Sequence, residues 1–117
     1  MCTLTWWRCA QSGYVLRMNR DELRTRLAET AAQVRVRGGR RFIAPGDGDA
    51  GDTWISVSDA GVTVAILNGY VPADRTTSAR RSRGQLVLDL ADVRTRDEAL
   101  ARLADDAPQR YRSFVLV

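Results

Sequence analysis

Cys2 directly follows Met1, a position in which one residue can supply two reactive groups. A small second residue allows an aminopeptidase to remove Met1, after which Cys2 would carry both its thiol and a free α-amine. The ordinary pKa is about 8.5 for a thiol and about 7.7–8.0 for an α-amine, so the amine can act as the base that activates the thiol. Cys2 is therefore a candidate nucleophile that brings its own base.

Asn19-Arg20-Asp21-Glu22 is a second group of residues that could take part in chemistry. The elements that must position it are two strands. Residues 2–8 alternate with a period of two, residues 9–13 have turn-forming side chains, and residues 14–18 are again apolar and extended. This pattern predicts an antiparallel hairpin. Strand pairing would bring the Asn19-Arg20-Asp21-Glu22 segment back beside Cys2.

A second hairpin is predicted further along the chain. Residues 53–57 and 62–68 form the clearest strands, and Ser58-Asp59-Ala60-Gly61 joins them. The run 62–67 is nearly continuous in apolar residues, which is typical of a strand in the middle of a sheet. Asn68 ends that run and is the next candidate polar group.

Two helices and a last strand complete the expected elements. Residues 84–93 and 95–104 favour helices, and Thr95 could cap the second of them. Residues 111–117 are apolar and β-prone, which predicts a strand at the end of the sequence.

The chain between the two hairpins is the most ambiguous. Residues 21–34 have apolar side chains at nearly helical spacing, so we predict a short helix that Asp21 could cap and that Gly38-Gly39 follows. Residues 44–52 are rich in Gly, Pro and Asp and predict an exposed loop. The loop lacks the distal Glu of an EF-hand, which disfavours calcium.

Composition sets the outer bounds. At 117 residues, 1–117 is predicted to be a single domain with a real core. The net charge is +4, and all 18 basic residues are Arg, which we interpret as coding bias. Two Cys are too few for a disulfide framework, and the absence of His excludes a zinc site or a His-based triad. We expect no metal site and no cofactor. The sequence shows neither a signal peptide nor a membrane span, which predicts a cytoplasmic protein.

Cys2 together with Asn19-Arg20-Asp21-Glu22 resembles the NRDE family, also called the transport and Golgi organisation protein 2 family. Further stretches fall in the family's order: Asp52-Thr53-Trp54-Ile55, Asp59-Ala60-Gly61-Val62, Leu67-Asn68 and Ser82-Arg83-Gly84-Gln85-Leu86. The resemblance implies an α+β, N-terminal-nucleophile (Ntn) hydrolase-like αββα sandwich with an antiparallel sheet and a helix pair. It also implies an irregular loop, in place of the short helix, in the segment after Asp21. Only the N-terminal portion of the fold would be present, so we expect self-association or a partner half.

The resemblance assigns roles to four catalytic candidates. Cys2 would attack a non-peptide C–N amide bond of a small substrate, and Asp21 would hold and orient its α-amine. Arg20 would favour the thiolate by charge, and the Asn68 amide would stabilise the oxyanion. Simpler interpretations stay open: a core cysteine, a helix cap, a solvated arginine, and an Asn-Gly turn at Asn68-Gly69.

Whether the protein is an enzyme is left open, because other functions fit the same residues. The resemblance also allows a non-catalytic carrier or trafficking protein for hydrophobic cargo, either haem or acyl lipid. A third possibility is nucleic-acid binding, which is disfavoured because no aromatic residue is interleaved with its arginines, Arg75, Arg80, Arg81 and Arg83. We expect the three tryptophans, Trp6, Trp7 and Trp54, to pack in the core and on sheet faces, and Cys9 to be structural.

Overall fold

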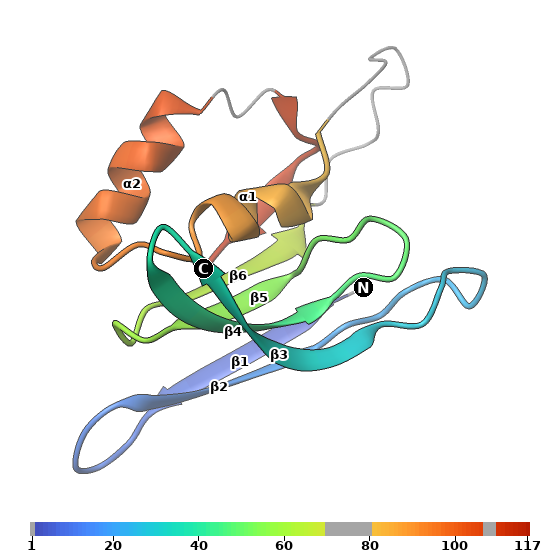
Figure 1. Ribbon diagram of the computed structural model, residues 1–117. Coiled ribbons are helices and arrows are strands. Elements are labelled where there is room, and N and C mark those ends of the chain that lie inside the picture. Colours follow the sequence, from blue (N-terminus) through green and yellow to red (C-terminus); the bar gives the residue numbers. More distant parts are fainter. Residues whose placement is uncertain (1, 70–80, 107–109) are drawn as a thin grey trace.

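The structure is a computed structural model that describes residues 2–69, 81–106 and 110–117. Figure 1 shows how its helices and strands are arranged. In these ranges the chain forms, in order, β1 (Thr3–Arg8), β2 (Tyr14–Asn19), β3 (Thr30–Arg37), β4 (Arg40–Gly46), β5 (Ile55–Ser58), β6 (Thr63–Asn68), α1 (Arg83–Asp89), α2 (Arg96–Asp105) and β7 (Phe114–Leu116). The fold is α+β, as predicted, with two antiparallel sheets and two helices, and is compatible with a partial sandwich.

β1 and β2 form a two-stranded sheet of their own. Their register runs from Arg8↔Tyr14 near the turn to Thr3↔Asn19 at the open end, which confirms the predicted first hairpin. At the turn, the Cys9 amide donates to the Gly13 carbonyl over 3.1 Å. The open end of this hairpin is where the candidate site begins.

The other five strands form a sheet in the order β3-β4-β5-β6-β7, with every neighbouring pair antiparallel. The β5–β6 hairpin is confirmed, and the buried apolar side chains of β6 lie between β5 and β7, as predicted for a central strand. The helices lie on one side of this sheet and the β1–β2 hairpin on the other (Figure 1).

The core lies between α1 and the sheet. Leu86, Val87 and Leu90 of the α1 segment pack with Val64 and Ile66 of β6, and all five are at most 6% exposed. Burying a Val, Leu or Ile side chain contributes roughly 1.5–3 kcal/mol, so this cluster fixes α1 on β6. The end of β6 and the start of α1 are therefore held at the same edge of the molecule.

The second helix begins as expected. The Glu98 amide donates to the Thr95 hydroxyl over 3.1 Å, which confirms Thr95 as the cap of α2. α1 is shorter than predicted, because the chain leaves the helix after Asp89.

The helix predicted for residues 21–34 is wrong. Residues 21–29 contain no helix, and β3 occupies Thr30–Arg37. The apolar residues that suggested helical spacing do not face a core, since Leu23 is 72% and Leu27 66% exposed. Gly38 and Gly39 both have positive φ, 55° and 75°, and form the two-residue turn that pairs β3 with β4. The cap proposed for Asp21 therefore has no helix to cap.

The exposed loop predicted for residues 44–52 is also wrong in part. β4 extends through Gly46, and Asp47 and Asp52 are buried, at 8% and 4% exposure. Buried carboxylates need partners or a function. Both carboxylates line the cavity described below.

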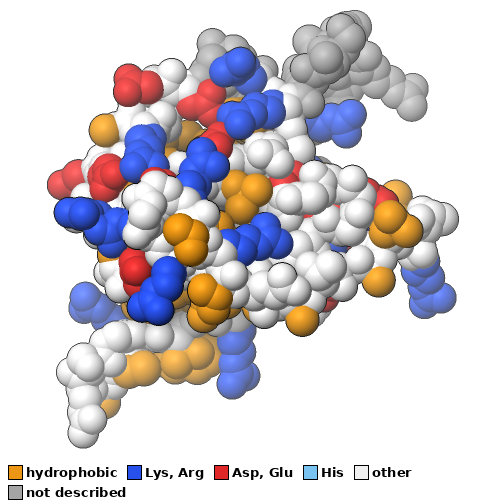
Figure 2. Space-filling view, viewed as in Figure 1, with side chains coloured by type: hydrophobic (Ala, Val, Ile, Leu, Met, Phe, Trp, Pro, Cys, Tyr) orange, Lys and Arg blue, Asp and Glu red, His pale blue; other side chains and the backbone are white. Residues whose placement is uncertain are grey.

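Some apolar side chains stay on the surface. Val34, Ile43 and Val57 are cross-strand neighbours on the face of the five-stranded sheet that α1 does not cover, and with Val36 they form an outer apolar face, each residue at least 44% exposed. Figure 2 shows further apolar side chains along the β1–β2 hairpin, whereas arginines and acidic residues intermingle over the helices. No helix in the described ranges is long and apolar enough to cross a membrane.

Candidate functional site

The β1–β2 hairpin brings the two ends of the proposed motif together. Thr3 pairs with Asn19, so Cys2 lies just before the first paired residue and Arg20 just after the last. Cys2 is partly buried, whereas Asn19 and Asp21 are exposed. The register alone therefore places the candidate nucleophile beside the Asn19-Arg20-Asp21-Glu22 segment.

A cavity of about 100 Å³ opens at this end of the hairpin. Cys2, Arg20 and Asn68 all line it, although Asn68 comes from β6 in the other sheet. The remaining lining residues are Glu22, Arg26, Asp47, Asp52, Thr53, Trp54, Ile66, Ser82, Arg83 and Gly84. Three of the four catalytic candidates thus share one cavity, and Asp21 is not among its lining residues.

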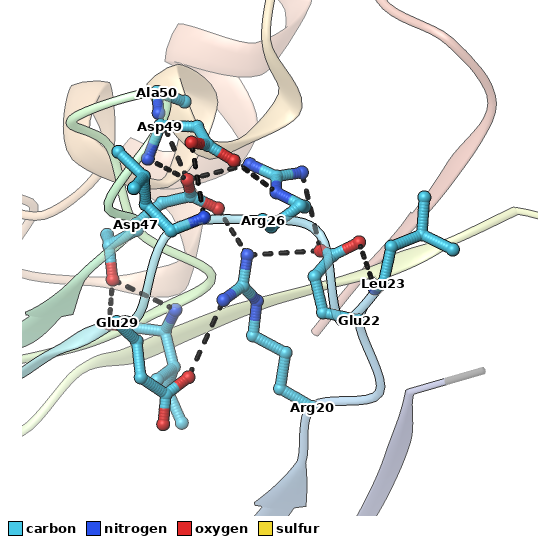
Figure 3. Close-up of polar contacts among 11 residues, drawn as sticks. Arg20, Glu22, Leu23, Arg26, Glu29, Asp47, Asp49 and Ala50 are labelled. Carbon is cyan, nitrogen blue, oxygen red and sulfur yellow. Dashed lines mark hydrogen bonds and ion pairs between the residues drawn. The ribbon is translucent and has the colours of Figure 1, made fainter.

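Arg20 is held by a group of carboxylates (Figure 3). Its guanidinium pairs with the Asp47 carboxylate, with Glu22 Oε2 over 3.1 Å and with Glu29 Oε2 over 3.5 Å. It also lies over the Trp54 ring, 4.2 Å from the centroid. Its side chain is only 11% exposed, so these contacts fix the guanidinium at the cavity wall. The alternative of a solvated surface arginine is wrong.

Asp47 joins the hairpin to the rest of the protein. It binds Arg26 Nη2 over 2.7 Å as well as Arg20, and its Oδ1 accepts the amides of Asp49 and Ala50 over 2.9 and 3.0 Å (Figure 3). Burial would raise the pKa of Asp47. The two amides and the two arginine charges outweigh it and lower that pKa below its ordinary value. Asp47 therefore stays ionised as the centre of the network.

Asp21 interacts with the amino terminus. A hydrogen bond with the chain's α-amino group, followed by the charge of that group, lowers the pKa of Asp21. That group belongs to Met1, so the interaction does not test the predicted orientation of the Cys2 α-amine, which stays a prediction.

Asn68 is the last residue of β6 and the register partner of Phe114 in β7. The next amide, of Gly69, donates to the Ser113 carbonyl over 2.9 Å, so strand pairing continues past Asn68. The interpretation of Asn68-Gly69 as a tight turn is therefore wrong.

Arg83 is a cavity residue whose role sequence reasoning missed. The sequence places Arg83 in the Ser82-Arg83-Gly84-Gln85-Leu86 stretch of the family resemblance and among the possible nucleic-acid contacts, but assigns it no role at the site. Arg83 Nη1 donates to the Ser113 carbonyl over 3.1 Å, and Arg83 forms no ion pair with any carboxylate in the described part of the chain. Burial and the charge of Arg112 lower the pKa of Arg83, while Cys2 and Glu22 act in the opposite direction.

Asp52 was also missed. Its side chain is buried at the cavity wall, and Oδ2 has no hydrogen-bond partner among the described residues. It lies against Gly84: a Cβ at that position would be 2.3 Å from Asp52 Cγ. Only glycine fits there without displacing the carboxylate.

The other predicted groups fall elsewhere. Trp54 packs against the core, as expected, whereas Trp6 and Trp7 are 58% and 42% exposed on β1, so these two are not core residues and only the sheet-face position fits them. In the potential nucleic-acid group, Arg75 and Arg80 lie outside the described residues, while Arg81 binds Asp89 over 2.7 Å. The described residues contain no cluster of His, Cys, Asp and Glu that could hold a metal ion.

A second, larger cavity of about 610 Å³ lies between the hairpin and the outer side of the five-stranded sheet. Its walls include Trp6 and Leu16 from the hairpin and Thr63 and Val117 from the sheet. Tyr14 bridges the two, since its hydroxyl lies 2.5 Å from Thr63 Oγ1. Cys9 also lines this cavity and is exposed.

Comparison with known proteins gives one match. A family model described as "Transport and Golgi organisation 2" matches residues 1–117. No curated protein and no solved structure matches the chain.

Proposed function

The chain belongs to the Transport and Golgi organisation 2 family, and on that premise we propose that it is an Ntn-type hydrolase that cleaves a non-peptide amide with Cys2 as the nucleophile. The observation that carries the proposal is the shared cavity. Cys2 directly precedes β1 of the hairpin and Asn68 ends β6 of the other sheet, yet both line a space of about 100 Å³. A nucleophile and an amide donor at one small cavity are the two groups that acyl transfer needs.

The proposed reaction has two steps. After removal of Met1, the α-amine of Cys2 takes the thiol proton, and the thiolate attacks the carbonyl carbon of the amide. The Asn68 side chain donates a hydrogen bond to the resulting oxyanion. The intermediate collapses to a thioester as the C–N bond breaks, and the proton passes from the α-ammonium to the leaving amine. A water molecule then hydrolyses the thioester, which releases the acid and restores the thiol.

Asp21 and Arg20 have supporting roles in this proposal. Asp21 would orient the α-amine that Cys2 carries once Met1 is removed, since strand pairing places Asp21 two residues beyond Asn19, the partner of Thr3. Arg20 contributes positive charge at the cavity wall, where Asp47, Glu22 and Glu29 fix its position. Because its charge is shared with these carboxylates, we expect Arg20 to position the site more than to activate the thiol.

The first test is the N-terminal mass of the protein produced without a tag. We expect loss of Met1, and complete retention of Met1 would refute the mechanism, because Cys2 would have no free amine. The second test compares Cys2→Ala with Cys9→Ala on a panel of acyl amides. Cys9 is exposed and lies at the far end of the hairpin, so it is a matched control. Activity should disappear only in Cys2→Ala, and Asn68→Ala should lower kcat by about 100-fold.

A second candidate function is binding of hydrophobic cargo, either haem or acyl lipid. The observation that favours it is the cavity of about 610 Å³, which is within the usual size range of small-molecule sites and has exposed Trp6 at its wall. Titration with haemin and with acyl-CoA, followed by absorbance or by fluorescence, tests this function. Tight binding that Trp6→Ala weakens and Cys2→Ala leaves unchanged would support a carrier, whereas absence of binding would remove this candidate.

A further inference from the structure

The charges around the smaller cavity are not all neutralised within the protein. Three arginines and three carboxylates line it. Two of the arginines, Arg20 and Arg26, form ion pairs with Glu22 and Asp47. Among the described residues this leaves one cation, Arg83, and one carboxylate, Asp52, without an ion-pair partner.

Arg83 has capacity for an anion. One of its guanidinium nitrogens donates to the Ser113 carbonyl, which neutralises no charge, and no described carboxylate pairs with it. The guanidinium is partly buried, so water screens its charge less than it would on an open surface. Arginine favours carboxylate and phosphate because its planar fork of donors matches two oxygen atoms.

Asp52 is an independent observation at the same cavity. Its carboxylate is only 4% exposed and Oδ2 lacks a hydrogen-bond partner in the described chain. A buried acceptor without a partner is destabilising, and a donor on a bound ligand would remove that cost. Arg83 and Asp52 therefore line the same cavity without an ion pair between them, which leaves a cation and an acceptor for a ligand.

We propose that the cavity selects amides whose amine part carries an oxyanion, with Arg83 binding the oxyanion and Asp52 Oδ2 accepting a hydrogen bond from an N–H of the same molecule. An N-acyl amino acid has both groups next to the scissile bond. A phosphate in place of the carboxylate would use the same arginine chemistry. This inference rests on the hydrolase proposal for its reaction, but its binding step can be measured separately.

The experiment measures binding to the full chain carrying Cys2→Ala, which cannot turn over by the proposed mechanism. Three probes share one acyl group: an N-acylglycine, an N-acyl-2-aminoethyl phosphate and a neutral N-acyl propylamine. We expect at least one anionic probe to bind about tenfold or more tightly than the neutral one by calorimetry, with the preference weakening as salt is added. The ranking of the two anionic probes distinguishes carboxylate from phosphate. Equal binding of all three would overturn the inference.

Matched variants locate the effect. Arg83→Gln, in the Cys2→Ala background, should bring the anionic probes to the affinity of the neutral probe, and Arg83→Lys should keep part of the preference. Arg112→Gln removes the same charge from a nearby exposed residue that does not line the cavity, and should leave the preference in place. Equal losses in Arg83→Gln and Arg112→Gln would overturn a specific role for Arg83. If Arg83→Gln does not fold, the test uses Arg83→Lys and the salt dependence of binding instead. An unchanged preference in Arg83→Lys together with no effect of salt would overturn the role of Arg83.

Turnover separates this inference from the proposed function. Protein with a free Cys2 should hydrolyse the anionic amides with the lower KM. If it hydrolyses none of the probes while the Cys2→Ala form prefers the anionic ones, the hydrolase proposal fails and the anion site stands. If it hydrolyses all three probes with equal KM, the hydrolase proposal stands and the anion site fails.

Discussion

Replacing Asp47 with Asn removes one charge from the centre of the network that joins the hairpin to the five-stranded sheet. Asp47 Oδ1 accepts the amides of Asp49 and Ala50, while Oδ2 faces Arg20. An Asn side chain that keeps its oxygen on the two amides must turn its NH₂ group toward the Arg20 guanidinium. Two donors would then face each other at a site where Asp47 is 8% and Arg20 11% exposed.

The expected loss of stability follows from that burial. Removing one partner of a buried ion pair typically costs about 3–5 kcal/mol. The Asn keeps both turn hydrogen bonds, and Arg20 keeps Glu22 and Glu29, so we expect the lower part of that range, about 3 kcal/mol. Against a total of roughly 5–15 kcal/mol for a domain, this is a large share.

Urea unfolding followed by tryptophan fluorescence and circular dichroism measures the loss. Asp59→Asn is the matched control, because Asp59 is 38% exposed and binds Arg40 over 3.3 Å at another turn. We expect that control to lose less than about 1 kcal/mol. A loss in Asp47→Asn no larger than in Asp59→Asn would refute our view that Asp47 is a buried anchor.

The same substitution should change the response to acid. The pKa of Asp47 is lower in the folded protein than its ordinary value, so its contribution is present above the unfolded pKa of about 3.9. That contribution is lost as the pH falls from there toward the folded pKa. The difference between wild type and Asp47→Asn should therefore be full at neutral pH and shrink below about pH 4, and a difference that does not change with pH would contradict this assignment.

Three further results are expected. Gly84→Ala should destabilise the protein by about 1–3 kcal/mol in urea unfolding, because its Cβ would meet the Asp52 carboxylate; unchanged stability would show that Asp52 can move aside. Thr95→Ala should cost about 1 kcal/mol through loss of the α2 cap, whereas Thr95→Ser should keep most of it, as measured by thermal unfolding. The outer apolar face should promote self-association, which light scattering across a dilution series would detect and Ile43→Lys should weaken; a monomer at every concentration would contradict this.

Elements with local signals were predictable from the sequence. The two hairpins, the cap at Thr95 and the burial of β6 all follow from period-two alternation, turn chemistry and capping residues close in sequence. The neighbourhood of Cys2 and Arg20 was predictable for the same reason, since one short hairpin makes it.

β3 was missed because the pattern of its segment fits two periods. Val34 fits the end of a helical stripe with Leu23 and Leu27, but Val34 and Val36 also alternate with arginines, as in a strand. Neither the helical nor the strand pattern here marks a buried face, because the apolar side chains that form both patterns are exposed. Pairing with β4 through the Gly38-Gly39 turn decides the outcome, and tertiary pairing of this kind overrides local propensity.

The missed site residues depend on long-range packing. Asp47 and Asp52 lie in a stretch whose composition is typical of a surface loop, and only the approach of Arg20 and of Gly84 shows why they are buried. Arg83 becomes a cavity residue because α1 packs on β6, which brings its first turn beside Asn68. No spacing within the sequence reports either contact.

The separate hairpin has a consequence for how the protein loses its site. A lone two-stranded sheet is marginally stable in water, so β1 and β2 keep their place through the anchors at Tyr14 and at Arg20. Opening of this hairpin would break those anchors, while the α1–β6 core stays intact. Its amides should therefore exchange with solvent water through a local opening that requires less free energy than global unfolding. Since Cys2 is carried on this hairpin, the cavity would come apart while most of the chain is still folded.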